Sequence, residues 1–301
     1  MFIITYRKFF YLISGILFVA SLAVLALWGL NLGIDFKGGA LLEVGYAAPA
    51  PEKEAIAQAV AAFDAHASVR RAGDGGYLVR LRELSDAAHR ALLSALSFSG
   101  AFPAVEIRFD SIGPILGREA ALRSLLALAL VMLCIVLFIT FAFRKVSEPV
   151  SSWKYGVITI IALLHDVLIP VGVFAYLGHV AGVEVDTLFV TALLVVLGFS
   201  VHDTIVVFDR VRENLRLAHN TGAREIFADT VGKSVSQTVT RSINTSLTTL
   251  FALAALYFLG PVSTQYFSLA LIIGIVAGTY SSICIASPLL VTAEQLQKKS
   301  A

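Results

Sequence analysis

Two pairs of ionisable residues interrupt apolar stretches of this 301-residue sequence. His202 and Asp203 interrupt residues 187–208, and His165 and Asp166 interrupt residues 155–178. Stretches of this length and apolar character are typical of membrane-spanning helices, where an ionisable side chain costs several kcal/mol and needs a reason. Carboxyl and imidazole groups gain and lose protons, so the chemistry that these four residues could perform is proton transfer.

Arg241 is the basic residue best placed to act on Asp203. Asp203 lies about five residues, or roughly 8 Å of helix, inside the membrane, and Arg241 lies at a similar depth if the fifth span enters the membrane near Ser236. Burial favours the neutral form of an Asp, whereas a nearby Arg favours the charged form. An Asp between these influences can take up a proton on one side and release it on the other. The alternative is that Arg241 extends its side chain to the membrane surface.

A stripe of polar residues continues from Arg241 along one face of the same predicted helix. The residues recur at helical spacing for two further turns, which favours a hydrated interior face. The stripe consists of Gln237, Arg241, Asn244, Thr245 and Thr248. We rank its last three members after Asp203 and Arg241. Asp209 has the same second rank, because we interpret it mainly as an ion-pair residue at the membrane surface.

The His165–Asp166 pair has two interpretations. It can belong to a proton relay, in which we include both residues, or it can form hydrogen bonds that fix helix packing. Asp166 shares one helix face with three small or polar residues, Thr159, Ala162 and Pro170. The proline can kink the helix at that point.

The composition indicates an integral membrane protein. Hydrophobic residues make up 57% of the chain and charged residues 15%, whereas soluble domains carry about 25% charged residues. The net charge of +2 comes from scattered basic residues, which argues against a nucleic-acid-binding patch. The sequence contains no Walker loop, HExxH or GxSxG motif. We therefore expect no enzyme activity, no metal site and no cofactor, and we expect the two cysteines to be small core residues.

Six stretches are long and apolar enough to cross a bilayer. They comprise residues 9–30, 124–143, 155–178, 187–208, 242–260 and 267–291. Lys and Arg gather before the first stretch, between the second and third, between the fourth and fifth, and after the sixth. Because basic residues mark the cytoplasmic side, both termini are predicted to be cytoplasmic. Residues 223–231 are predicted to form an amphipathic segment on the membrane surface.

The polar segment 31–118, between the first two spans, is predicted to be an extracytoplasmic domain. Alternating and helical patterns predict the order β-α-β-β-α-β, which indicates a ferredoxin-like α+β fold. The chain thus divides into residues 1–30 with the first span, the outer domain 31–118, and a five-span domain 119–301. The sequence "GIDFKGG" joins span and outer domain, and its residues Asp35, Gly38 and Gly39 are predicted to form a linker turn.

Several motifs together resemble the SecF-type proteins of the SecD/SecF protein-export family. They are "IDFKGG" at 34–39, "SIGPILGRE" at 111–119, "ALLHDV" at 162–167, "DTIVVFDRVREN" at 203–214 and "RSINTSLTTL" at 241–250. Their order, their spacing and the six-span layout agree over nearly the whole chain.

This resemblance implies a half-transporter of the RND superfamily in the bacterial cytoplasmic membrane. Such proteins pair with a six-span SecD subunit, associate with the SecYEG channel and YajC, and use the proton gradient to promote preprotein movement. The proton-path residues of the family, an Asp in the fourth span and an Arg in the fifth, fall on Asp203 and Arg241. His202 stands where the family often has Asn, and it can join the relay or shift its pH range.

Two other functions compete with protein export. An RND-type transporter of small molecules or lipids would use the same relay but would need a larger outer domain to hold its substrate. A scaffold without transport would use the buried charges only to lock the SecD interface. Crosslinking to a moving preprotein separates export from small-molecule transport, and proton flux separates both from the scaffold.

Overall fold

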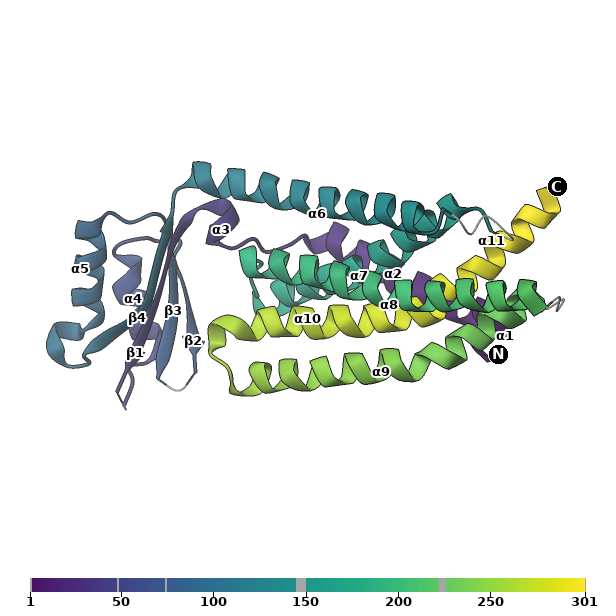
Figure 1. Cartoon of the computed structure of the whole chain (residues 1–301). Helices are drawn as coiled ribbons and strands as arrows, with labels where there is room; N and C mark the ends of the chain where they lie inside the picture. The colour runs from purple at the N-terminus through teal and green to yellow at the C-terminus, as the bar shows by residue number, and fades with distance from the viewer. Residues whose placement is uncertain (1, 48, 74, 145–149, 222–225, 301) are drawn as a thin grey trace. The chain divides into compact units, whose positions relative to one another are not determined.

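The computed structural model describes residues 2–47, 49–73, 75–144, 150–221 and 226–300, which fold into two compact units (Figure 1). The helical unit comprises Met1–Asn31, Leu126–Glu184 and Leu188–Ala301. The sheet unit comprises Leu32–Leu125 and Val185–Thr187. The sheet unit therefore takes in the start of the second long helix and a short segment before the fourth, beyond the predicted outer domain 31–118.

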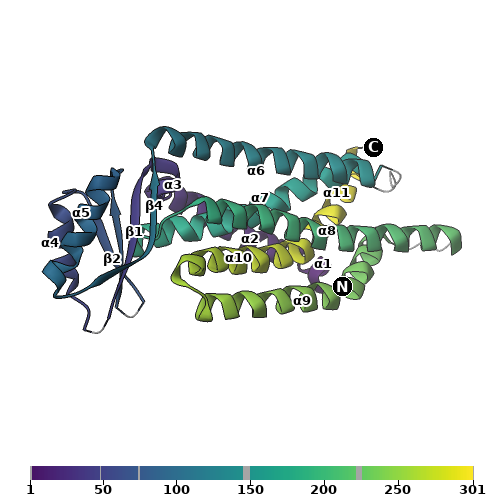
Figure 2. The ribbon, with the colours of Figure 1, turned by 60° about the vertical axis from the view of Figure 1, so that its left-hand side comes forward.

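The sheet unit has the predicted order β-α-β-β-α-β. A helical turn, α3 (Ile34–Lys37), comes first, and a 3₁₀ turn (Phe98–Gly100) precedes the last strand. The main elements are β1 (Gly39–Tyr46), α4 (Lys53–Ala61), β2 (Ser68–Ala72), β3 (Gly76–Leu81), α5 (Asp86–Leu96) and β4 (Ala104–Ile112). The antiparallel strands lie in the order β2-β3-β1-β4, and α4 and α5 cover one face of the sheet (Figure 2). The ferredoxin-like prediction is confirmed.

Alternation of apolar residues builds the core of the sheet unit. Leu42 and Val44 of β1 are fully buried and pack with Ile56 of α4 and Leu92 of α5. Period-two burial on a strand and a helical stripe above it are what a two-layer core requires. The Ser85 hydroxyl caps α5 by accepting a hydrogen bond from the backbone N–H of the third residue of the helix.

Asp64, just after α4, links the two layers through backbone hydrogen bonds. Its carboxylate accepts from the backbone N–H groups of Arg82 at 2.8 Å and His66 at 2.9 Å. These bonds, that from Arg82 first, hold the pKa of Asp64 below its usual value.

In the described part of the chain, six helices are long and apolar enough to span a membrane, in agreement with the predicted fold class, and they make up most of the helical unit. A short helix, α1 (Phe2–Thr5), precedes them. The first five are α2 (Arg7–Trp28), α6 (Pro114–Ala142), α7 (Ser152–Ala181), α8 (Thr187–Thr221) and α9 (Phe227–Leu259). The sixth is α10 (Val262–Ser281), which continues through a π-helical turn (Ser282–Ala286) into α11 (Ser287–Ser300).

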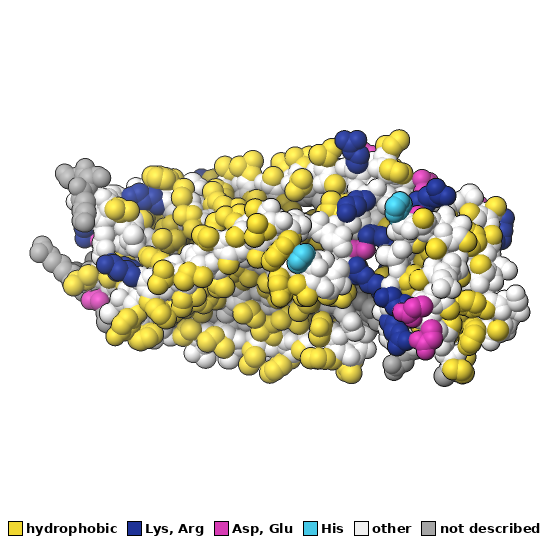
Figure 3. All heavy atoms as spheres, turned by 180° about the vertical axis from the view of Figure 1, so that it is seen from behind, with side chains coloured by type: hydrophobic (Ala, Val, Ile, Leu, Met, Phe, Trp, Pro, Cys, Tyr) yellow, Lys and Arg dark blue, Asp and Glu magenta, His cyan; other side chains and the backbone are white. Residues whose placement is uncertain are grey.

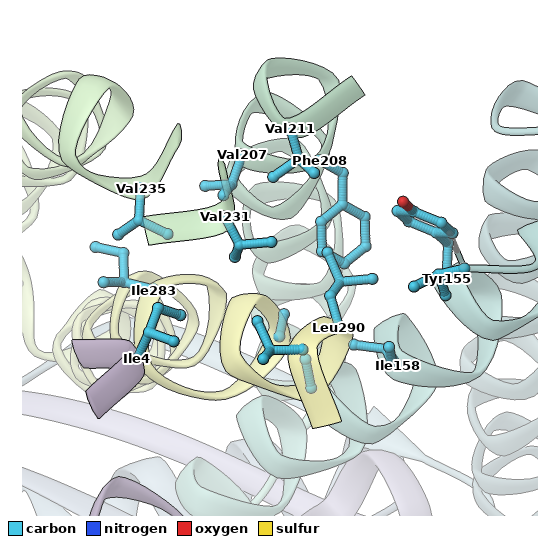
Figure 4. Close-up of a cluster of buried hydrophobic side chains, with 14 of the residues drawn as sticks. Ile4, Tyr155, Ile158, Val207, Phe208, Val211, Val231, Val235, Ile283 and Leu290 are labelled. Atoms are coloured by element: carbon cyan, nitrogen blue, oxygen red, sulfur yellow. The ribbon is translucent and has the colours of Figure 1, made fainter. Parts of the chain in front are cut away.

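The structure contradicts the prediction that residues 223–231 lie on the membrane surface, in the part of this segment that it describes. Residues 222–225 lie outside the described part of the chain, and α9 begins at Phe227. Phe227 and Val231 are buried in one cluster with Val207 and Phe208 of α8 (Figure 4). The apolar side of this segment packs on its neighbouring helix, which buries more apolar surface than a position along the membrane would.

Apolar side chains cover the outside of the helical unit (Figure 3). The most apolar windows of α2 and α6 are only 6% buried within the chain, as expected of helices that face lipid or another membrane protein. Cys134 on α6 is exposed, which corrects its prediction as a core residue, whereas Cys284 is buried and both thiols are free. Cys134 lies on a side of α6 that the rest of this chain does not cover.

Candidate functional site

Asp203 lies in a buried position on α8. Its side chain is 2% exposed, and its Oδ2 atom has no hydrogen-bond partner among the described residues. Ser242 of α9, His202 and Arg241 are the side chains that act on it electrostatically. The hydroxyl of Ser242 is also buried and lies close enough to Asp203 to act on it, but in the described ranges it forms no hydrogen bond of good geometry. Asp203 is thus held in an apolar surrounding without the hydrogen bonds that usually fix a buried carboxyl.

Arg241 and His202 are both exposed on the surface of this chain. Among the described residues, Arg241 forms no ion pair with Asp203, although the two interact electrostatically. The similar depth inferred from the sequence agrees with this arrangement, because the neighbour of Arg241 along α9, Ser242, is the residue that Asp203 faces. The direct pair is not formed within the single chain.

Within this chain the polar stripe of α9 is exposed, although its first member, Gln237, accepts hydrogen bonds from α8. All of its members are exposed: Gln237, Arg241, Asn244, Thr245 and Thr248. The buried side of α9 instead carries Ser234, Thr238 and Ser246, spaced one or more turns apart. Each of these hydroxyls donates to a backbone carbonyl four residues back on its own helix. Small residues with internally satisfied hydroxyls let helices approach closely, so they take the packed side.

A hydrogen-bonded clasp joins α8 to α9 near their connection. Asn214 donates from Nδ2 to Ser234 Oγ at 2.8 Å and to Gln237 Oε1 at 2.9 Å. Arg210 Nε donates to the same Gln237 oxygen at 2.7 Å. These bonds set the register that brings Ser242 opposite Asp203. Asp209 takes no part in the clasp and forms an exposed ion pair with Arg212 one turn further on.

Asp166 forms a second buried centre, in which three helices meet at one carboxyl group. The side chain is 0% exposed, and its Oδ2 accepts from Ser200 of α8 at 2.5 Å and Ser281 of α10 at 2.6 Å. Its Oδ1 lies 2.9 Å from His165 Nδ1. The predicted stripe on α7 is buried in full. These contacts fix the packing of α7, α8 and α10 around a group that can carry a proton.

Sequence reasoning did not identify Ser281 or Ser242. The glycines of α10 could have pointed to Ser281. Side chains at Gly274 and Gly278 would overlap Val196 and Ser200 of α8. This spacing marks the α10 face that approaches α8, and Ser281 follows Gly278 on the same face. Ser200, which donates to Asp166, and Asp203 are three residues apart on α8. The two buried carboxyl groups therefore lie along the same face of this helix.

The predicted junction residues lie within the sheet unit. Asp35 of α3 accepts from the backbone N–H and the hydroxyl of Thr187, the first residue of α8, at 2.8 and 2.6 Å. A negative charge is stabilising at a helix N-terminus. The predicted linker turn is therefore a helical turn that caps α8.

The two glycines after α3 permit a close backbone contact. Gly38 and Gly39 have φ angles of 79° and 128°, which side chains rarely adopt. A Cβ atom at Gly38 would lie 2.7 Å from Cα of Pro114, and one at Gly117 would lie 2.9 Å from the Gly38 nitrogen. The motifs "IDFKGG" and "SIGPILGRE" thus pack directly against each other.

The described residues contain no group of three or more His, Cys, Asp or Glu side chains placed to hold a metal ion. Both centres hold an ionisable group inside an apolar helix bundle. The Asp166 carboxyl is fixed by contacts with His165, Ser200 and Ser281, whereas Oδ2 of Asp203 has no hydrogen-bond partner among the described residues.

Two family models match this sequence. The model described as protein export membrane protein SecD/SecF, C-terminal, covers residues 94–296. The model described as the SecD/SecF GG motif covers residues 29–50.

Similar proteins extend the match to the whole chain. The protein translocase subunit SecF of Thermobaculum terrenum is 46% identical over 303 residues, covering 97% of this chain and 93% of that protein. The subunit of the same name from Anaerolinea thermophila is 39% identical, covering 95% and 91%. The crystal structure of SecDF, a translocon-associated membrane protein from Thermus thermophilus, matches with a TM-score of 0.81 at 30% identity. That match covers 99% of this chain and 38% of the longer SecDF chain.

Proposed function

The chain belongs to the SecD/SecF protein-export family, and from this premise we propose that it is the SecF-type subunit of a protein translocase driven by the proton-motive force. It acts as a transport component, without catalysing a chemical reaction and without a cofactor. The observation that carries the proposal is a buried carboxyl at Asp203 flanked by exposed Arg241 and His202.

A SecD-type subunit is the partner that we propose for the exposed stripe of α9. An arginine and several amide and hydroxyl groups on a lipid-facing surface would be costly, so a second membrane protein is expected to cover them. The crystal structure of SecDF supports this choice, because this chain matches 38% of a longer chain that bears both names. Heterodimer formation would enclose Arg241 and His202 beside Asp203 and complete the site.

Proton passage at the completed site supplies the energy. Asp203 takes up a proton from one side of the membrane while it is shielded from Arg241, and releases it when Arg241 stabilises the carboxylate. Each proton that crosses supplies ~2.3 kcal/mol per 100 mV of membrane potential. His202 and the His165–Asp166 pair belong to the same relay, and Asn244, Thr245 and Thr248 line its hydrated side.

The family indicates the membrane, and the distribution of basic residues indicates the orientation. We place the chain in the bacterial cytoplasmic membrane with both termini in the cytoplasm and the sheet unit outside. There the SecD–SecF unit associates with the SecYEG channel and YajC, and it promotes the late movement of preproteins.

The test uses preprotein translocation by the complete SecD–SecF complex with an imposed proton gradient. Asp203→Asn is expected to lower proton-dependent translocation by about 10²-fold, the scale of a positioned proton-transfer group. The matched control is Asp209→Asn, which changes an exposed acid one and a half turns away and is expected to retain activity. Full activity of Asp203→Asn in assembled complexes would rule out the proposed relay.

A further inference from the structure

Three side-chain hydrogen bonds form a ladder between α2 and the last span. The pairs are Ser14 Oγ with Tyr280 OH at 3.0 Å, Tyr11 OH with Thr292 Oγ1 at 3.1 Å, and Arg7 Nη2 with Gln295 Oε1 at 2.8 Å. The α2 residues are spaced by four and three positions, so they share one helix face. Three polar pairs along one face are unusual between apolar helices.

The ladder leads from one end of the helical unit into its interior. Its outer rung, at Arg7, lies at the end that carries both chain termini (Figure 1). Its inner rung, at Ser14, is formed by the one residue of α2 that is buried in the described chain, at 7% exposure. The hydroxyl of Tyr280 at this rung also lies 3.2 Å from the carbonyl oxygen of Phe10, to which it can donate.

His165 lies at the inner end of the ladder. The imidazole is 3% exposed, and Nδ1 contacts Asp166 while Nε2 is buried with no hydrogen-bond partner among the described residues. The centre of its ring lies 6.1 Å from the centre of the Tyr280 ring. A buried ring nitrogen without a partner is costly and calls for an explanation. The position of His165 next to the innermost hydroxyls of the ladder provides that explanation.

We propose that the ladder and His165 form a proton-exchange path between Asp166 and the end of the helical unit that carries the termini. The proposed path includes a water molecule that bridges Nε2 and the Tyr280 hydroxyl. Because the Arg7 guanidinium stays charged, a proton enters at the Tyr11 and Thr292 hydroxyls rather than through the outer rung; it then binds Nε2, and the proton on Nδ1 passes to Oδ1 of Asp166. Release reverses both transfers, so the imidazole is neutral again and one proton has moved for each change in the charge of Asp166.

Other titratable groups border this path. Facing it from the packed elements are His165 of α7, Tyr280 and the neighbouring Cys284 of the last span, and Tyr11 and Arg7 of α2. The charge of Arg7 at the outer end also acts on Tyr11. The tyrosines keep their own protons on average and transfer them by exchange.

The path has a mechanical consequence at α10. Ser281, which donates to Asp166, immediately precedes the π-helical turn Ser282–Ala286. Such turns hold one extra residue per turn and often occur at functional sites. Protonation of Asp166 weakens it as an acceptor for Ser281, so the charge of Asp166 biases the register of the helix at this turn. This inference rests on the proposed function and adds to it a second proton position with its own access path.

The experiment follows the carboxyl of Asp166 by infrared spectroscopy in the SecD–SecF complex in lipid vesicles. The band is assigned by its loss in Asp166→Asn, and the pH is stepped on the side of the termini. Tyr280→Phe, which keeps the ring and removes the hydroxyl, is expected to slow the proton exchange of Asp166 by about tenfold or more. Ser14→Ala is expected to act in the same direction and serves if Tyr280→Phe does not fold.

The matched control is Tyr176→Phe, an exposed tyrosine of α7 that lies outside the ladder. It is expected to leave the exchange rate unchanged. An Asp166 band that does not respond to pH, or equal exchange rates in the original protein and both ladder variants, would overturn the path. The spectroscopic rate is read independently of preprotein export, so failure of the proposed function and failure of this inference are distinguishable.

Discussion

Removal of the Ser281 hydroxyl is expected to destabilise the helical unit more than removal of a hydroxyl bonded only within its own helix. Ser281 is fully buried and donates at 2.6 Å to Oδ2 of Asp166, a residue 115 positions away in the chain, and its Oγ also lies 3.1 Å from the carbonyl oxygen of Gly278 on its own helix. Hydrogen bonds to a charged acceptor contribute about 1.5–3 kcal/mol, so we expect Ser281→Ala to lower the free energy of unfolding by about 2 kcal/mol.

Ser268 provides a matched control on the same helix. It is equally buried, and its hydroxyl donates at 2.8 Å to the carbonyl of Thr264 on its own helix. A neutral hydrogen bond inside a membrane protein contributes ~0.6 kcal/mol on average, so Ser268→Ala should cost about that amount. The expected difference of about 1.4 kcal/mol is a tenfold change in the unfolding equilibrium constant.

The measurement is reversible unfolding of the purified protein in mixed micelles. A double-mutant cycle with Asp166→Asn isolates the contact itself, because Ser281→Ala should lose most of its cost when the carboxylate is already replaced. Equal costs for the two serines, or a cost for Ser281→Ala that is unchanged in the Asp166→Asn background, would refute the reasoning that Asp166 is a charged acceptor.

Three further predictions concern the rest of the chain. Gly38→Ala should destabilise the sheet unit by about 1–3 kcal/mol more than Gly73→Ala, measured by hydrogen exchange of the strands, since both have positive φ but only the first meets backbone within 4 Å. Asp64 has a lowered pKa, so it stabilises the fold above its unfolded pKa and this contribution is lost as pH falls through the folded value; Asp64→Asn should flatten the acid unfolding curve. Asn214→Ala, which removes both amide bonds of the α8–α9 clasp, should lower the free energy of unfolding in micelles by about 1–2 kcal/mol and leave Gln237 held by Arg210 alone.

Periodicity and composition were sufficient to predict the type and order of the helices and strands of this protein. The alternation at β1 and the helical stripe of α5 predicted a two-layer domain, because period-two and period-3.6 patterns leave a single way to bury their apolar faces. The six spans follow from length and hydropathy alone. The helix ends were predicted less well: α8 extends to Thr221 and α9 begins at Phe227, because charged residues past the membrane surface continue a helix as readily as they end it.

The sequence by itself determined that Asp203, Asp166 and Arg241 lie in spans, since hydropathy depends only on neighbours along the chain. Which side of α9 faces inward was decided by the tertiary structure. Both sides of that helix repeat with the period of a helix, and the small hydroxyl residues take the packed side, where Ser234 meets Asn214 of α8 and Ser246 meets Thr279 of α10.

The hydrogen bonds of Asp166 likewise depend on the tertiary structure. Its two serine partners come from helices 34 and 115 residues away, and no local pattern relates positions so distant. The two serines meet at Asp166 because Gly278 lets α10 approach Ser200 of α8 closely. This approach depends on how the surfaces of the two helices fit together, which the order of residues along the chain does not reveal.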